Sequence, residues 1–368
     1  MKLAERLKFF DASGIRKVFD LARTMTNPVN LSIGQPDFDI PEIFKKEAKK
    51  AIDQGFNSYT PTQGLQETID LVNNLVYQSK GYKPPDTIIT SGVSGGILLS
   101  YLALLDPGDE IIIPDPYFVM YKHLARLTGS KPVFLDTYPD FCIKKSALLP
   151  LINSKTRCIV INSPNNPTGN VLSEEDIALV VETAKRHNLV IISDEIYDYF
   201  LYDRKSLPSP WGKYENVVLL NGFSKAFSMT GWRIGYACGP KDLINEMKKL
   251  QQYTFVCAPS FAQKSLSVIA EADMSVYRNS YREKRDMIWL GLKDKYSLQK
   301  PGGAFYAFPR SPYDTDKFIA AALKEQMLII PGNVFSEKNT HFRIAFAQSD
   351  ETIRRGLEIF NKIAGENR

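Results

Sequence analysis

Cysteine and histidine are scarce in this chain, which has four cysteines and three histidines among 368 residues. The cysteines lie far apart and form no CxxC pair or Cys/His cluster, which argues against a disulfide framework or a structural zinc site. None of the histidines lies near a nucleophile motif, which disfavours a Ser-His-Asp triad and a multi-histidine metal mechanism. The sequence therefore predicts free thiols and a functional site without a metal.

Long apolar runs and blocks of one charge are also missing. No stretch of about 18 apolar residues could span a bilayer, and the first residues, MKLAERLKFFDASG, carry too many charges for a secretory signal. Lysine and arginine total 46 against 41 aspartates and glutamates, and the net charge of +5 is spread along the chain. This distribution gives no basic arm for nucleic acid. We therefore expect a cytoplasmic protein that binds neither nucleic acid nor membranes.

Between residues 86 and 240, short apolar strands alternate with helical stretches. The alternation favours parallel strands joined by crossover helices, and strands that are apolar on both faces indicate a sheet covered on both sides. The sequence thus predicts an α/β fold whose large domain holds a mostly parallel sheet flanked by helices. The expected strands are 87–90, 110–114, 131–137, 157–164, 189–195, 216–222 and 232–239.

The pattern changes after residue 240. Residues 260–295 have the periodicity of one long amphipathic helix, and shorter strands and helices follow it. The first 38 residues contain a helix near 13–25, and we expect them to pack with the C-terminal part. The chain is therefore predicted to form a small α+β domain from residues 1–38 and 275–368, with the large domain at 39–274. The expected C-terminal elements are strands at 304–309, 327–332 and 341–347 and helices at 314–325 and 350–364.

Polar or small residues follow several of the predicted strands. In an open α/β sheet, ligands bind beyond the carboxyl ends of the strands. Small residues at Ser91–Gly96 follow one strand, Asn165 and Asn166 follow another, and Asp194 and Tyr197 follow a third. Taken singly, these segments also fit a tight turn, a polar turn and a helix cap. Neither GxGxxG nor a P-loop occurs, so a nucleotide is not favoured.

Lys225 follows the strand at 216–222 and has small and apolar neighbours. Such surroundings desolvate a lysine and favour the neutral amine, which is the form that makes Schiff bases. Arg233 lies at the start of the next strand and can reach the same cleft. The predicted set comprises an anion cradle, a buried carboxylate, amide and phenol donors and a lysine. These groups match, in that order, a phosphate, a protonated pyridine nitrogen, a phenolic oxygen and an aldehyde. That combination predicts pyridoxal 5′-phosphate (PLP) as the cofactor.

Eight segments carry a resemblance to a known family: LSIGQPDF, YTPTQGLQE, PDPYF, SPNNPTGN, SDEIYD, NGFSKAFSMTGWRIGY, PGGAFY and FRIAFA. Over essentially its full length the chain resembles the class I/II aminotransferases of PLP fold-type I, nearest the prokaryotic aspartate/aromatic branch. The resemblance implies that Lys225 forms the internal aldimine and shuttles protons, and that Asp194 keeps the pyridine nitrogen protonated. It further implies ring contacts from Asn166, Tyr197 and Phe118, phosphate contacts from Val93, Ser94, Ser224 and Arg233, and substrate contacts from Gly34, Asn162, Asn166 and Arg343.

Two departures from the family pattern bear on the substrate and the phosphate. Gly222 stands where the family often has a serine, three residues before the lysine, so one phosphate hydroxyl is missing. No second arginine is evident for a dicarboxylate side chain. The expected pocket lining of Ile15, Phe118 and Phe255 is apolar. We therefore expect apolar or aromatic amino acids as substrates, with glutamate and 2-oxoglutarate as a second pair.

The segment 57–64 is a loop between two helical stretches, and on local sequence alone it also fits a solvated loop. In the family that the chain resembles, this loop crosses a two-fold interface and the tyrosine at the position of Tyr59 reaches the partner's PLP phosphate. The resemblance thus implies a homodimer with shared active sites.

Three functions remain open at this point. The first is an aminotransferase that moves an amino group between an L-amino acid and a 2-oxo acid by a ping-pong mechanism. The second is a PLP-dependent β-lyase or ring-forming synthase, because the same lysine, aspartate and arginine serve those reactions. The third is a PLP-binding regulatory module, which usually needs a DNA-binding extension that this chain lacks.

Overall fold

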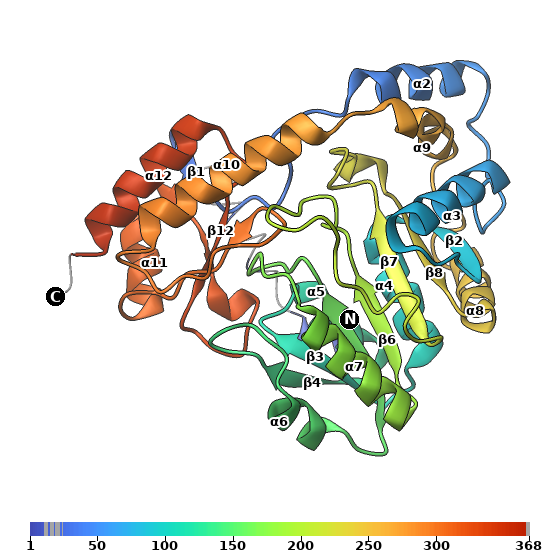
Figure 1. Cartoon of the computed structure of the whole chain (residues 1–368), viewed down its shortest axis with the longest axis horizontal. Coiled ribbons are helices and arrows are strands. Elements are labelled where there is room, and N and C mark those ends of the chain that lie inside the picture. The colour runs from blue at the N-terminus through green and yellow to red at the C-terminus, as the bar shows by residue number, and fades with distance from the viewer. Residues whose placement is uncertain (11–13, 15–17, 19–22, 24, 366–368) are drawn as a thin grey trace.

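A seven-stranded sheet forms the centre of the computed structural model, which describes residues 1–10, 14, 18, 23 and 25–365 (Figure 1). The strand order is β2-β8-β7-β6-β5-β3-β4. β8 is antiparallel to both of its neighbours, and the other pairs are parallel. The predicted strands and the mostly parallel α/β sheet are thus confirmed. The strands are β2 (Asp86–Ser91), β3 (Glu110–Asp115), β4 (Lys131–Asp136), β5 (Thr156–Asn162), β6 (Val190–Asp194), β7 (Val217–Gly222) and β8 (Ile234–Gly239).

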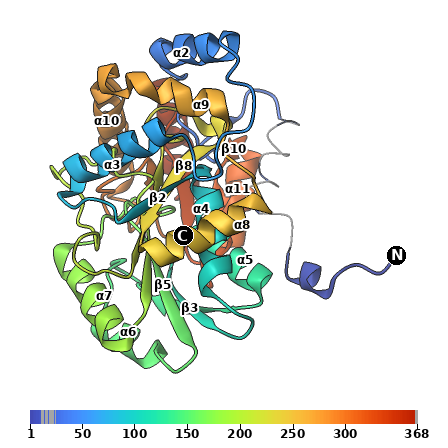
Figure 2. The same ribbon diagram turned by 90° about the vertical axis from the view of Figure 1, so that its right-hand side faces the viewer.

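Helices cover both faces of this sheet, as Figure 2 shows. α3 (Gln66–Lys80) and α7 (Glu174–His187) lie on one face, and α4 (Gly92–Leu104), α5 (Val119–Thr128) and α8 (Lys241–Gln252) lie on the other. Successive strand residues point to opposite faces, so Ile191 joins the core beneath α3 and Ile192 joins the core beneath α4. Two separate apolar cores therefore hold the sheet in place.

The start of α7 follows directly from its local sequence. The Ser173 hydroxyl accepts a hydrogen bond from the Asp176 N–H at 3.1 Å, and the Asp176 carboxylate accepts one from the Ser173 N–H at 2.8 Å. This reciprocal capping satisfies two backbone donors that the first helical turn leaves free. Ser173 therefore caps the helix, and α7 begins directly after it.

Strands from both ends of the chain pair beside the large sheet. β1 (Val29–Asn30) pairs in parallel with β10 (Met327–Leu328), and β11 (Ile330–Pro331), β12 (Phe342–Ala345) and β9 (Tyr306–Ala307) form an antiparallel sheet. Together with the helices of the C-terminal part, they give the α+β part of the fold. These helices are α10 (Ser275–Leu292), α11 (Thr315–Lys324) and α12 (Asp350–Ile363).

Two predicted helices need comment. The helix expected at 13–25 falls mostly outside the described residues. The single helix expected over 260–295 is wrong, because α9 (Ser260–Ser265) and η4 (Leu266–Glu271) end before α10 begins. Ala272 is extended, and the Asp273 carboxylate accepts a hydrogen bond from the Ser275 N–H at 2.8 Å. Such a local bond offers the backbone an alternative to a continuous helix. The remaining elements are η1 (Glu5–Phe9), α2 (Glu42–Asp53), α6 (Lys145–Leu148), η2 (Leu149–Leu151), η3 (Thr230–Trp232) and η5 (Gly332–Val334).

All four cysteines are free, as expected, and Cys158 and Cys238 are buried in strands. Among the helices that the structure describes, none is both long enough and apolar enough to cross a membrane.

Three glycines let β7, β8 and the start of α4 approach closely. A Cβ atom on Gly222 would lie 2.8 Å from the Gly235 Cα, and one on Gly235 would lie 2.8 Å from the Gly92 carbonyl carbon. Backbone atoms at such distances leave no room for a side chain. This contact brings the segment after β7, which carries Lys225, against the first turn of α4. It also explains why position 222 cannot hold a serine without a backbone shift.

Candidate active site

A cavity of about 320 Å³ opens beyond the carboxyl ends of β5, β6 and β7. Its lining combines residues at the ends of these strands, residues of α4 and α5, and residues of the α+β part such as Tyr306 and Arg343. The structure brings together twelve of the predicted site residues there: Gly34, Val93, Ser94, Phe118, Asn162, Asn166, Asp194, Tyr197, Ser224, Lys225, Arg233 and Arg343.

Lys225 is held in an apolar part of this cavity. Its Nζ donates a hydrogen bond to the Gly34 carbonyl at 2.8 Å and lies 5.9 Å from the ring centroid of Tyr197. Burial, together with the nearby guanidinium groups of Arg343 and Arg233, lowers the pKa of Lys225 to about 8. A neutral, nucleophilic amine is therefore accessible near neutral pH.

Asp194 ends β6 with a buried side chain. One carboxylate oxygen accepts a hydrogen bond from the Tyr121 hydroxyl at 2.7 Å, and the other accepts one from the Ile196 N–H at 3.2 Å. Burial nevertheless raises the pKa of Asp194 to about 6, although the Tyr121 hydroxyl acts in the opposite direction. A carboxylate in this position is stabilised by any cationic donor that enters the cavity.

Arg343 on β12 is a buried cation aimed at the same cavity. It is 1% exposed, and its guanidinium donates to the Asn166 side-chain oxygen at 3.0 Å and to the Ser32 carbonyl at 2.7 Å. The guanidinium carbon Cζ lies 4.7 Å from the ring centroid of Tyr306 and 4.6 Å from that of Phe335. Among the described residues, no hydrogen-bond partner reaches its Nε. A buried guanidinium without a carboxylate is costly unless an anion binds there.

A second cation, Arg233, packs on the first turn of α4. It donates to the Thr230 carbonyl at 3.0 Å, and it adopts φ +53°. Gly92 has φ +65°, and a Cβ atom there would lie 2.7 Å from an Arg233 guanidinium nitrogen. The predicted turn before the helix is part of the helix itself, because α4 begins at Gly92. The free N–H groups of that turn and the guanidinium together form a site suited to a phosphate.

Sequence reasoning missed two tyrosines of the cavity. Tyr121 contacts Asp194 as described, and the Tyr306 hydroxyl lies 2.9 Å from that of Tyr197. The motif PGGAFY contains Tyr306, whereas Tyr121 lies three residues beyond Phe118, outside the motif PDPYF. What was lacking was their orientation, because the spacing of residues along α5 and β9 does not by itself define which side chains face Asp194 or Tyr197.

Two other predicted positions, Tyr59 and Phe255, lie outside this lining. Tyr59 is 84% exposed and does not line the cavity of its own chain. Phe255 is not part of the lining either, and its ring packs beside Gly95 in α4. Ile15 lies outside the described residues. The prediction that Phe255 lines the pocket is therefore wrong, because the turn after α8 directs that ring toward the helix. Within the described part of the chain, no cluster of three or more His, Cys, Asp or Glu residues is arranged to hold a metal ion.

Comparison with known proteins agrees with this geometry. Residues 26–360 match the model of the family "Aminotransferase class I and II". The chain is 37% identical over 375 residues to a "Probable aspartate aminotransferase" of Methanocaldococcus jannaschii, covering 98% of this chain and 99% of the relative. It is 34% identical to "Aromatic-amino-acid aminotransferase 2" of Thermococcus litoralis, with both chains covered completely.

A solved structure of the aspartate aminotransferase of Thermus thermophilus with maleate superposes with a TM-score of 0.92. That protein is 32% identical, and the match covers 99% of this chain and 100% of the other. The chain therefore belongs to the class I and II aminotransferase family. It is a transaminase built on the fold of the structures it matches.

Proposed function

We propose that this aminotransferase binds pyridoxal 5′-phosphate in the described cavity and uses Lys225 to move an amino group between an L-amino acid and a 2-oxo acid. The observation that carries this proposal is the meeting of Lys225, Asp194, Arg233 and Arg343 in one cavity. These four groups come from three separate segments, since only Lys225 and Arg233 share one, so their convergence depends on the fold.

The residues present fit such a cofactor. Gly92 leaves space beside Arg233 that a Cβ atom would fill, which suits the phosphate, while the buried Arg343 Nε, which lacks a partner among the described residues, offers a donor to an anionic substrate. Asp194 supplies an acceptor for a protonated ring nitrogen. Since Asn166 uses its side-chain oxygen to accept from Arg343, its amide N–H₂ remains to donate to an oxygen in the cavity.

Each residue then has a distinct task. Arg233 and the first turn of α4, with Val93, Ser94 and Ser224 nearby, bind the phosphate. Phe118 flanks the ring, and Tyr197 and Asn166 donate to its phenolic oxygen. When bound, the cofactor supplies an aldehyde that takes up the amino group and a ring that accepts the electron pair of the α-carbon. Lys225 removes and returns the α-proton through its neutral Nζ.

Arg343 is proposed to bind the substrate α-carboxylate. Its two terminal nitrogens are held by Asn166 and Ser32, so the guanidinium plane is oriented before the substrate arrives. Asn162 supports Asn166 because its side-chain oxygen accepts a hydrogen bond from the Asn166 N–H at 2.9 Å. Gly34 leaves room at the substrate end, since a Cβ atom there would lie 2.6 Å from the Tyr306 hydroxyl.

The side-chain end of the cavity favours apolar or aromatic substrates. Among the described lining residues, the only cations are Lys225, Arg233 and Arg343, and each already has a proposed task. The other lining side chains nearby include Ile33, Ile97 and the uncharged Gln35. A panel of amino donors with 2-oxoglutarate tests this. A kcat/KM for aspartate more than about tenfold above that for every apolar donor would overturn the preference. Such a ratio corresponds to about 1.4 kcal/mol in activation free energy.

The main experiment tests the covalent role of Lys225. Purified protein incubated with PLP should show cofactor absorbance, and borohydride followed by peptide mapping should find the cofactor on Lys225. Adding a single amino donor should convert the absorbance to that of the aminated cofactor. Lys225→Ala should abolish trapping and nearly all transamination. Cofactor trapped on another lysine would refute the assignment.

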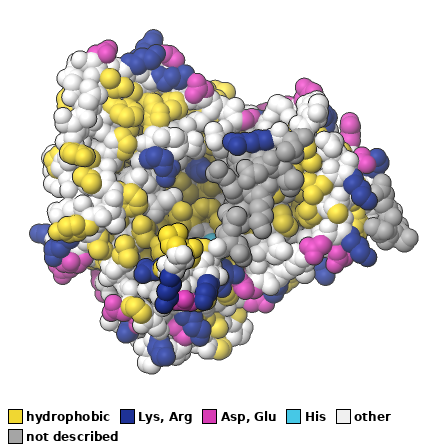
Figure 3. Space-filling view, turned by 180° about the vertical axis from the view of Figure 1, so that it is seen from behind, with side chains coloured by type: hydrophobic (Ala, Val, Ile, Leu, Met, Phe, Trp, Pro, Cys, Tyr) yellow, Lys and Arg dark blue, Asp and Glu magenta, His cyan; other side chains and the backbone are white. Residues whose placement is uncertain are grey.

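Three further proposals concern the whole chain. We infer a homodimer, for which the protruding Tyr59 and the hydrophobic side chains around the hollow on the rear face in Figure 3 are the support. We infer a division into a small domain of residues 1–38 and 275–368 and a large domain of 39–274, supported by the pairing of β1 with β10. A cytoplasmic location also stays a prediction.

A further inference from the structure

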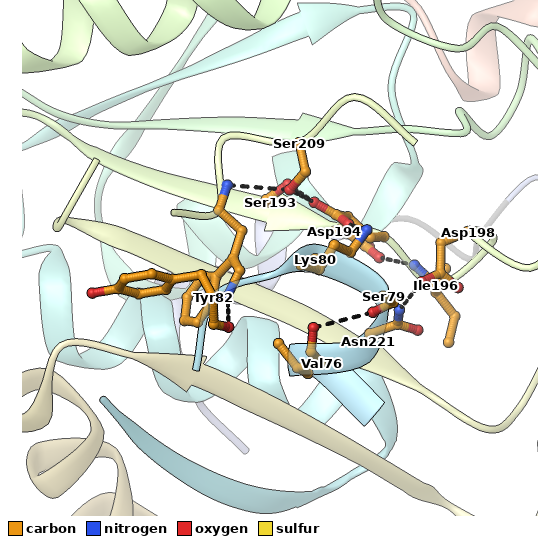
Figure 4. A network of polar contacts seen from close by, with 12 residues as sticks. Val76, Ser79, Lys80, Tyr82, Ser193, Asp194, Ile196, Asp198, Ser209 and Asn221 are labelled. Carbon is orange, nitrogen blue, oxygen red and sulfur yellow. Dashed lines mark hydrogen bonds and ion pairs between the residues drawn. The ribbon is translucent and has the colours of Figure 1, made fainter. Parts of the chain in front are cut away.

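A buried ion pair lies on the opposite side of the sheet from the cavity. Lys80, the last residue of α3, places its Nζ 2.5 Å from a carboxylate oxygen of Glu195, and the side chains are only 8% and 1% exposed. The other Glu195 oxygen accepts hydrogen bonds from the hydroxyls of Ser193 at 2.8 Å and Ser209 at 2.6 Å. Figure 4 shows Lys80 reaching into this group of residues from α3. Glu195 is thus fully hydrogen-bonded although it is buried.

A second carboxylate extends the network toward β7. Asp198 accepts a hydrogen bond from the Asn221 side-chain amide at 2.8 Å, and the Asn221 oxygen accepts one from the Gly222 N–H at 2.7 Å. Although burial acts in the opposite direction, Glu195 and Asp198 raise the pKa of Lys80, so it remains a cation. The network therefore joins the turn after β6 to the end of β7, three residues before Lys225.

This network adjoins both strand ends that carry the site. Ser193 and Asp194 are neighbours in β6 and point to opposite faces, with Ser193 toward Lys80 and Asp194 toward the cavity. Asp194 contacts the backbone of Ile196, within the segment that Glu195 and Asp198 anchor. The proposed function requires Asp194 and Lys225 to hold fixed positions against one cofactor, and this network borders the segments that carry both residues.

We propose that Lys80 is a positioning residue for the active site: it neutralises Glu195 behind Asp194 and braces the ends of β6 and β7 without touching substrate or cofactor. This inference rests on the proposed function. The electrostatic part of this inference predicts the direction in which each charge shifts the pKa of Asp194. The Glu195 charge raises the pKa of Asp194, and the Lys80 ammonium opposes that charge. The other charged or titratable groups facing Asp194 and Lys225 are Tyr101, Tyr121, Tyr197, Arg233 and Arg343, and Tyr236 faces the network from β8.

Three variants separate charge from packing: Lys80→Met, Glu195→Gln and the double variant. Lys213→Met is the matched control, because Lys213 also pairs with a glutamate, Glu174, at 2.7 Å but on the exposed surface. For each holoenzyme, one measures the pH midpoint of the absorbance change of the bound cofactor, the Kd for PLP and the Tm. The midpoint reports the charge near the cofactor. A purely structural defect would not shift this midpoint in opposite directions when a positive and a negative charge are removed.

Lys80→Met leaves an uncompensated negative charge, which should raise the midpoint by about one pH unit. Glu195→Gln should lower it by a similar amount, and the double variant should return close to wild type. If Lys80→Met does not fold, the step from Glu195→Gln to the double variant still measures removal of the Lys80 charge, and the midpoint should rise across it.

The outcomes are distinct. Midpoints that move in opposite directions, while Lys213→Met stays at the wild-type value, support the inference. A lower Tm with the same midpoint and the same PLP Kd in every variant overturns it and leaves the proposed function intact. A wild-type protein that does not bind PLP overturns both, whereas one that binds PLP with no titrating absorbance overturns this inference alone.

Discussion

At the residue scale, the cavity contains two groups whose charged forms are disfavoured. Burial lowers the pKa of Lys225 to about 8 and raises that of Asp194 to about 6. Both groups are ionised around neutral pH in an environment that solvates them poorly, so both destabilise the protein before a ligand compensates them. Such a cost is common where a site is organised for chemistry.

Lys225→Met should therefore stabilise the cofactor-free protein by about 1–3 kcal/mol at pH 7. The folded-state pKa of Lys225 is depressed, so between pH 8 and 10.5 the unfolded chain binds more protons and the stability of the wild type rises with pH. The gain from the substitution should shrink over that window and vanish near pH 10.5. Denaturant unfolding at pH 7 and 10.5 measures it, with Lys213→Met as the exposed control. An equal gain at both pH values would contradict the pKa argument.

Arg343→Ala should remove the proposed clamp for the α-carboxylate. Leaving that carboxylate unpaired costs about 2–5 kcal/mol, which corresponds to a kcat/KM roughly 30- to 4,000-fold lower for amino acids. Amines without a carboxylate should lose little, because they never used the guanidinium. Parallel steady-state kinetics with both donor types make the test. Equal losses for both would show that Arg343 acts through the structure of the site instead.

At the element scale, the close contact of β7, β8 and α4 positions the segments that we propose bind the cofactor. Gly222, Gly235 and Gly92 let three backbones meet where side chains would normally separate them. The segment after β7 and the first turn of α4 are thereby fixed next to each other. The missing serine hydroxyl at position 222 is a consequence of this packing.

Gly222→Ala should destabilise the protein by about 1–3 kcal/mol, because its Cβ would lie 2.8 Å from the Gly235 Cα and 3.1 Å from the Ile234 carbonyl oxygen. The affinity for PLP should fall as well, since β7 and β8 must move apart beside the segment that carries Lys225. Gly231→Ala is the control, because a Cβ atom there meets nothing within 4 Å. Thermal unfolding and cofactor titration of both variants check the prediction, and indistinguishable variants would disprove the packing argument.

At the scale of the whole molecule, the loop with Tyr59 is firmly anchored while Tyr59 itself protrudes. Gln263 accepts a hydrogen bond from the Leu65 N–H at 2.8 Å, and Gln251 donates to the Thr62 carbonyl at 2.5 Å. The Ile89 N–H on β2 donates to the Gln63 carbonyl at 2.9 Å. An exposed tyrosine on an anchored loop is suited to contact a second copy of the chain, since little ordering is needed on binding.

We predict a two-fold dimer that buries more than about 2,000 Å² in total, with Tyr59 contributing to the partner's site. Tyr59→Phe should weaken PLP binding by about 1–3 kcal/mol, the range for a buried polar partner left unsatisfied. Co-expressed Lys225→Ala and Tyr59→Ala chains should recover part of the activity, because one composite site in each heterodimer carries neither lesion. A fully active monomer, or verified heterodimers without recovery, would refute the shared site.

Much of the fold and of the site could be predicted from the sequence. The strands that became β2 to β8 were predictable because they are continuous apolar runs, and Ser173 marks its helix because capping depends on side chains three residues apart. Lys225, Asp194 and Arg343 were found because each lies in a motif at a strand end or within a strand. These are local properties, because each depends on only a few consecutive residues.

Only the tertiary structure decided how distant segments meet. Several contacts join residues that are more than 70 positions apart in the sequence. They are the hydrogen bonds of Tyr121 with Asp194 and of Tyr306 with Tyr197, and the ion pair of Lys80 with Glu195. The position of Phe255 likewise depends on its packing beside Gly95 in α4, whereas the break before α10 comes from a local bond between Asp273 and Ser275 that periodicity does not encode. The types of group in the candidate site were thus determined by local sequence. Their orientation, burial and shifted pKa values were determined by the three-dimensional packing, because desolvation and charge proximity depend on distances through space.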